Sequence, residues 1–191
     1  MKLDVVLAGD HVRLPGPVPG AASGGERIVP ATAVRDADPQ ADPPEIRTVL
    51  GETLFVPAGR RAALESFCTA NGIPRRSRPD VWGDLLEPFL DTEFTPGRLA
   101  ATRARLRRVG LGDEEVAAIR ARVAPLMRAY NAVHQDWHHL GLADLLDAAT
   151  AARIPEHRPV GSTDADAFRT WAMEIADLGF PGPGVEVGPG H

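Results

Sequence analysis

The sequence has little of what several large classes of protein need. Cys68 is its single cysteine, so the chain cannot form an internal disulfide bond and nothing implies an oxidising compartment. No apolar run approaches the length of a membrane span, and the stretch 1–7 is interrupted by Asp4 too early for a signal peptide. We therefore expect a soluble, cytoplasmic protein with no membrane partner.

Lysine is almost absent as well. Lys2 is the only lysine among 21 basic residues, and all the others are arginine. Arginine can bind a phosphate or a carboxylate through two N–H groups at once, but a GC-rich genome also favours its codons, so arginine abundance decides little. Because 26 acidic residues bring the formal net charge to −5, we expect no nucleic-acid partner.

The clearest positive signal is the stretch 113–140, which predicts one long helix. Its apolar residues recur at alternating steps of three and four, the spacing that keeps a seam on one side of a helix. They are Val116, Ile119, Val123, Leu126, Tyr130, Val133, Trp137 and Leu140. Asp113 can cap the first turn, Pro125 should bend the helix, and Gly141 is a natural stop. Such a helix would be roughly 40 Å long, so we expect other helices to pack along it.

Shorter segments with capping residues and glycine stops predict the other helices. They cover about 60–71, 79–90, 95–109, 142–153 and 163–178. We therefore predict a mainly α protein. It would be an irregular five- to six-helix bundle, built on one long central helix, with a small N-terminal strand and loop layer as a minor α+β component.

The first part of the chain is rich in proline and glycine and has no helical period. Short strands at about 3–7, 11–14, 27–29, 47–50 and 53–56 would form a small antiparallel sheet or a loosely attached arm. The segment 36–44, Asp-Ala-Asp-Pro-Gln-Ala-Asp-Pro-Pro, is typical of a stiff exposed linker. The predicted organisation is thus a strand-and-loop arm over 1–57, a helical domain over 58–180 and a flexible tail over 181–191.

Two histidines near the predicted end of the long helix have the spacing of a metal-binding pair. His134 and His138 are four residues apart, so on a helix their rings project from neighbouring turns of one face. The pair resembles the zinc-binding helix of metalloproteases. That motif, however, carries a glutamate after its first histidine as general base, and Gln135 cannot act in this way. We therefore discard a metalloprotease.

A more open site for a divalent metal such as zinc remains as a hypothesis. It would use His134 and His138 with a third, acidic ligand from Asp84, Glu87 or Asp91. Of these three acids, Glu87 is our candidate for the metal ligand.

The same stretch supplies the candidates for contacting a ligand: Tyr130, Asn131, His134 and Trp137. The structural alternative is a partly buried helix end. Tyr130 and Trp137 would then be packed rings whose polar tips are satisfied, and His134 would be a hydrogen-bonded residue at the edge of the core.

Two hypotheses of function follow. The first is a non-catalytic helical module for binding or assembly, which acts through protein–protein contact as a homodimer or with a partner protein. Its support is the long seam together with the proline- and glycine-rich arms. The second is a small helical enzyme or ligand-binding protein that uses a site around Tyr130, His134 and His138, with or without a metal.

Overall fold

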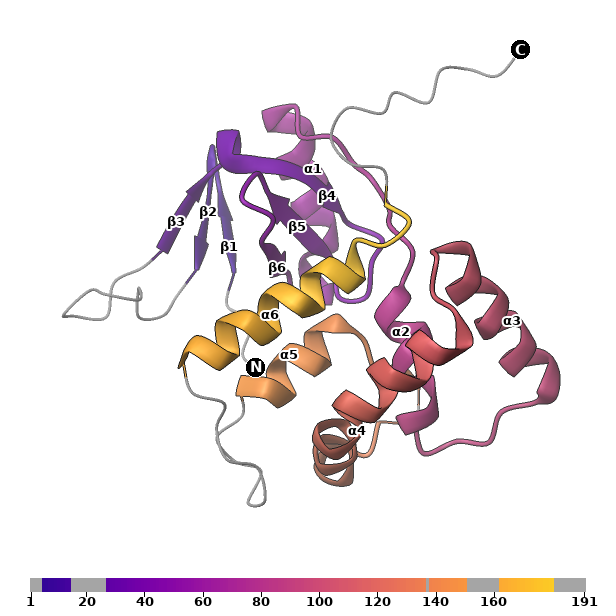
Figure 1. Cartoon of the computed structure of the whole chain (residues 1–191). Coiled ribbons are helices and arrows are strands. Elements are labelled where there is room, and N and C mark those ends of the chain that lie inside the picture. Colours follow the sequence, from indigo (N-terminus) through magenta and orange to yellow (C-terminus); the bar gives the residue numbers. More distant parts are fainter. Residues whose placement is uncertain (1–4, 15–26, 137, 151–161, 181–191) are drawn as a thin grey trace, which may run out of the picture. The chain divides into compact units, whose positions relative to one another are not determined.

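The structure is a computed structural model that describes residues 5–14, 27–136, 138–150 and 162–180 (Figure 1). The chain divides into two compact units, Met1–Ser77 and Arg78–His191. The first unit thus extends past residue 57, the boundary expected from the sequence, and takes in the first α-helix. The tail predicted for 181–191 lies outside the described residues.

The first unit contains two three-stranded antiparallel sheets. The first sheet has the order β1 (Val6–Ala8), β2 (His11–Leu14) and β3 (Arg27–Pro30). The second has the order β4 (Val34–Asp38), β5 (Glu45–Thr48) and β6 (Thr53–Phe55). The 3₁₀ turn η1 (Ala31–Ala33) joins the sheets, and η2 (Ala58–Arg60) leads into helix α1 (Arg61–Asn71).

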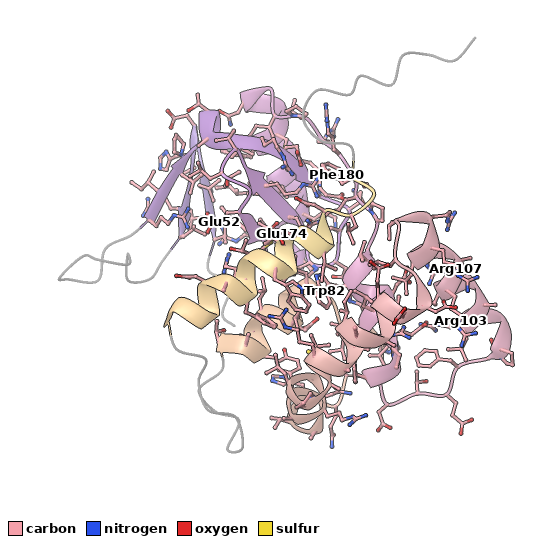
Figure 2. The ribbon with its side chains drawn as sticks, in the orientation of Figure 1. Glu52, Trp82, Arg103, Arg107, Glu174 and Phe180 are labelled. Carbon is pink, nitrogen blue, oxygen red and sulfur yellow. The ribbon has the colours of Figure 1, made fainter. Side chains whose placement is uncertain are left out.

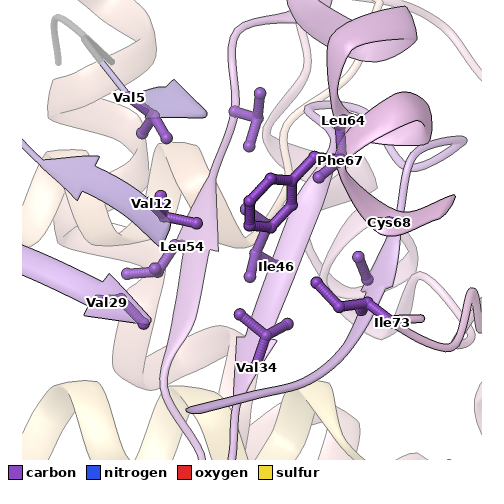
Figure 3. Close-up of a cluster of buried hydrophobic side chains, with 12 residues drawn as sticks. Val5, Val12, Val29, Val34, Ile46, Leu54, Leu64, Phe67, Cys68 and Ile73 are labelled. Atoms are coloured by element: carbon purple, nitrogen blue, oxygen red, sulfur yellow. The ribbon is translucent and has the colours of Figure 1, made fainter. Parts of the chain in front are cut away.

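Helix α1 completes the core of the first unit. Its buried Leu64, Phe67 and Cys68 pack in one cluster with side chains of both sheets, and Figure 3 shows the Phe67 ring beside Ile46. The helix ends at Gly72, which has a left-handed φ of 64°, as the glycine stop predicted. Burial raises the pKa of the Cys68 thiol, so Cys68 behaves as a small apolar residue.

The predicted fold class is wrong, because the strands are not a minor layer on a helical bundle but form two complete small sheets. The predicted linker over 36–44 is wrong for a related reason. Strand β4 passes through Asp36 and Asp38, whose side chains are buried. The guanidinium of Arg47, on the paired strand β5, binds the Asp36 carboxylate and also donates to Glu45 at 3.1 Å. A buried arginine therefore balances acids that look solvent-exposed in the sequence.

The second unit is helical. It contains α2 (Val81–Leu86), the 3₁₀ turn η3 (Glu87–Phe89), α3 (Pro96–Arg108), α4 (Asp113–His134), α5 (Leu142–Thr150) and α6 (Ser162–Ala176). Helix α2 contacts α3, α4 and α6, and its Trp82 is buried at the centre of this unit (Figure 2). Among the described residues, no helix has both the length and the apolar character that crossing a bilayer demands.

The long helix is shorter than its apolar seam predicted. Helix α4 ends at His134 instead of Leu140, and Val133 on the predicted seam is 70% exposed. Met127 and Asn131 are buried in its place, because an α-helix has 3.6 residues per turn and a stripe repeating every 3.5 residues drifts around it. The Asn131 side chain then accepts a hydrogen bond from the Asp136 N–H at 2.7 Å and helps to end the helix.

Candidate functional site

The predicted metal ligands do not form a metal-binding group in the structure. Among the described residues, no group of three or more histidine, cysteine, aspartate or glutamate side chains is arranged to hold a metal ion. Glu87 is buried and accepts hydrogen bonds from the Thr102 hydroxyl at 2.7 Å and from Nε of Arg98 at 2.5 Å. His134 and His138 are both exposed. The metal hypothesis stays a prediction, to which the geometry contributes no third ligand.

The predicted ligand-contacting residues are largely engaged within the protein. The rings of Tyr130 and His134 stack with centroids 4.1 Å apart and an interplanar angle of 20°. Burial, together with the nearby charge of Asp144, raises the pKa of the Tyr130 phenol, so this hydroxyl stays protonated. The amide nitrogen of Asn131 donates to the backbone carbonyls of Phe89 and Asp136. Trp137 lies outside the described residues.

A different histidine, His139, is part of a polar contact that the sequence did not reveal. Its Nε2 lies 2.7 Å from Oδ2 of Asp80, which is 59 residues away along the chain. Asp80 is the N-cap of α2, and its Oδ1 accepts a hydrogen bond from the Gly83 N–H at 2.9 Å. Burial alone would raise the pKa of the Asp80 carboxyl. The hydrogen bonds from His139 and Gly83 outweigh burial, so the pKa lies below its usual value.

Asp80 also borders a pocket of about 620 Å³ in the second unit. The pocket lies at the start of α2 and the end of α3, with Gly179 closing one side. Its lining consists of Pro79, Asp80, Val81, Asp84, Arg105, Leu106, Arg108, Val109 and Gly179. The guanidinium of Arg105 donates two hydrogen bonds to the Asp84 carboxylate, from Nη2 at 2.6 Å and from Nε at 2.9 Å. Arg108 is exposed and has no hydrogen-bond or ion-pair partner among the described residues.

A smaller pocket of about 310 Å³ lies next to Asn131. Asp91, one of the acids considered as a metal ligand, also lines it, whereas His134 and His138 do not. Because the Asn131 amide is used by backbone groups, it offers a ligand little further bonding capacity here.

The second notable surface lies in the first unit, at the turn that joins β5 to β6. The Thr48 N–H donates to the Glu52 carbonyl at 2.9 Å and the Gly51 N–H to the Thr48 carbonyl at 3.0 Å. Gly51 has a φ of 80°, which only glycine adopts without strain. Val49 and Leu50 occupy the tip and are 60% and 88% exposed.

This turn is attached firmly at its base. The Val49 N–H donates to the Ala33 carbonyl at 2.9 Å, which ties the turn to η1. Glu52 forms a two-pronged ion pair with Arg27 of β3, with Nη1 2.7 Å from Oε1. The exposed side chains of Val49 and Leu50 therefore project from a turn whose backbone is fixed by these contacts.

Comparison of the chain with protein-family models, with curated proteins and with solved structures finds no match in any of the three.

Proposed function

We propose that this protein is a non-catalytic binding module that acts through protein–protein contact, and that the tip of the β5–β6 turn enters the partner. The observation that carries the proposal is the exposure of Val49 and Leu50 on a turn whose base is fixed by hydrogen bonds and an ion pair. Single exposed apolar residues are ordinary, but two consecutive ones at the tip of a tight turn are not.

The turn itself does not require these residues. Asparagine, aspartate, serine and proline stabilise the central positions of such turns, whereas valine is stiff at its Cβ and gains nothing there. Val49 and Leu50, which are 60% and 88% exposed, also contribute little burial to folding. Burying either side chain in a partner would contribute about 1.5–3 kcal/mol before the costs of association. The pair is therefore better explained by binding than by folding.

A different protein with an apolar pocket fits the tip better than a second copy of this chain. Two side chains offer far less surface than the roughly 800 Å² per partner that a stable symmetric dimer buries. They suit instead the role of a small central anchor that fills a pocket on a larger surface. The hydrogen bond from the Val49 N–H reduces the entropy that the tip loses on binding.

A lipid surface fits the tip less well. Binding to anionic lipid needs a cluster of basic side chains beside the apolar residues. The charged residues next to this tip, Arg27 and Glu52, form an ion pair with each other, and Arg47 is buried. A protein pocket therefore remains the proposed partner surface.

The proposal is tested with two matched variants of the full chain. One variant carries Val49→Ser and Leu50→Ser. The control carries Ile28→Ser, which removes an exposed apolar side chain from β3 of the same unit; Ile28 is 59% exposed, against 60% for Val49. The wild type and the two variants are immobilised separately and exposed to the same extract of the source cells. The proteins bound to each of the three are then quantified. We expect a protein that wild type and control retain equally and the double variant loses about tenfold or more. Equal retention by all three would refute the proposal.

A further inference from the structure

We infer that the pocket at the start of α2 and the end of α3 binds a small organic carboxylate with an apolar body. This inference is independent of the proposed protein partner, because the β5–β6 tip belongs to the first unit and the whole pocket to the second. Its volume of about 620 Å³ lies within the usual range for small-molecule sites.

The apolar part of the lining would hold the body of the ligand. Val81 and Leu106 are buried and Val109 is half-buried. The backbone of Gly179 approaches Val109 so closely that a Cβ on this residue would lie 2.7 Å from Cγ1 of Val109. Gly179 also has a φ of 72°, which residues with a Cβ rarely adopt. Both its backbone conformation and the space beside Val109 therefore require glycine on this side of the pocket.

The charges of the lining decide the chemistry of the ligand's head. The Asp84 carboxylate is already bound by Arg105, and that of Asp80 by His139 and the Gly83 N–H. Arg108 is the lining residue whose charge has no partner among the described residues. A guanidinium binds a carboxylate through two parallel N–H donors. Arg108 can therefore bind one carboxylate group of a ligand in this pocket.

The two aspartates narrow the choice to a singly charged anion. Asp80 and Asp84 both line the pocket, and they would repel the two negative charges of a phosphate ester more than the single charge of a carboxylate. The apolar walls favour a carboxylate with an aliphatic body over a small inorganic ion.

The chain segments around the pocket are tied together before any ligand arrives. The side chain of Arg78, which precedes Pro79, is buried and forms an ion pair with Asp177 at 2.6 Å. Asp177 lies two residues before Gly179, so this pair holds the two ends of the lining in place. A pocket with walls set in this way loses little entropy when it binds.

The test uses the full chain labelled with ¹⁵N. It is titrated separately with 4-methylpentanoate, with the neutral 4-methylpentanamide and with inorganic phosphate, and NMR chemical shifts report binding. Two variants are compared. Arg108→Gln removes the candidate charge, and Arg103→Gln removes an exposed arginine of the same helix that does not line the pocket. Well-dispersed spectra of both variants verify folding.

We expect saturable shifts at lining residues with 4-methylpentanoate, and binding at least about tenfold weaker for the amide, for phosphate and for the carboxylate with Arg108→Gln. Arg103→Gln should change the affinity less than about twofold. The inference is overturned if 4-methylpentanoate gives no saturable shift up to about 10 mM, if amide or phosphate binds as well, or if Arg108→Gln binds like the wild type.

Discussion

The indole N–H of Trp82 donates a hydrogen bond of 2.8 Å to the backbone carbonyl of Ala172. Both residues are buried, and the bond connects α2 to α6 across 90 residues of sequence. Trp171 meets the Trp82 ring edge-on, with centroids 5.6 Å apart. The bond therefore satisfies the single polar atom of a side chain that is otherwise packed in the core of the second unit.

The variant Trp82→Phe should destabilise the protein by about 2–4 kcal/mol, since it removes this bond and leaves a space in the core. Urea unfolding followed by circular dichroism measures the loss. Trp171→Phe is the control, because Trp171 is only half-buried and phenylalanine keeps a ring next to Trp82. An equal loss in the two variants would show that the bond to Ala172 contributes nothing.

Arg47 should be among the least replaceable residues of the first unit. It is buried and binds the carboxylates of Asp36 and Glu45 as well as the Arg76 carbonyl. Arg47→Met takes the buried guanidinium away from two buried carboxylates and leaves Asp36 with the more exposed Arg35, so we expect a loss of about 3 kcal/mol in the free energy of unfolding.

Two further variants make this expectation specific. Adding Asp36→Asn to Arg47→Met should restore part of the stability, because it removes one of the two buried carboxylates that lost the Arg47 guanidinium. Arg35→Met, which removes the other arginine bound to Asp36, should cost less because Arg35 is more exposed and Arg47 remains. If Arg47→Met unfolds at the same urea concentration as the wild type, the buried charge cluster is not a stabilising part of the fold.

The contact between Asp80 and His139 predicts a specific dependence of stability on pH. The pKa of Asp80 is lower in the folded protein than its usual value of 3.8, so the folded state favours the carboxylate. The stabilisation is therefore present above the unfolded-state pKa and is lost as the pH falls through the lower folded-state pKa.

Asp80→Asn isolates this effect, because asparagine caps a helix about as well as aspartate. Since the Asp80 side chain is 60% exposed, we expect a loss of only about 0.5–1 kcal/mol near neutral pH, shrinking toward zero below about pH 4. Urea unfolding at a series of pH values gives the difference between wild type and variant. A difference that stays constant into acid would contradict the assigned pKa shift.

Local sequence signals were sufficient for several helix ends. Thr95 caps α3 with its hydroxyl on the Arg98 N–H, and Pro96 occupies the first turn, as that pair of residues predicts. Gly72 likewise ends α1, and the buried Ile73 follows it. These features depend on residues a few positions apart, so one sequence contains all the information.

Features that depend on distant partners could not be predicted in this way. Strand β4 looked like an exposed linker because nothing in the sequence links Asp36 to Arg47 on the neighbouring strand. Helix α4 looked longer because the Asn131 side chain replaces backbone bonds at its end. His139 carries no signal of its own in the sequence, because its partner Asp80 lies 59 residues away at the start of α2.

The central claim, that the β5–β6 tip enters a partner protein, is tested most directly by photo-cross-linking from position 50. Leu50 is replaced by the photoreactive amino acid benzoylphenylalanine in the full chain, which is expressed in the source cells and irradiated. The control carries the same amino acid in place of Ile28, another exposed apolar residue of the same unit. Ile28 is 59% exposed, compared with 60% for Val49 at the tip. We predict one dominant adduct with a different protein from position 50, absent from position 28 and lost when Val49→Ser is added. Adducts with only a second copy of this chain, or equal adducts from both positions, would contradict the account.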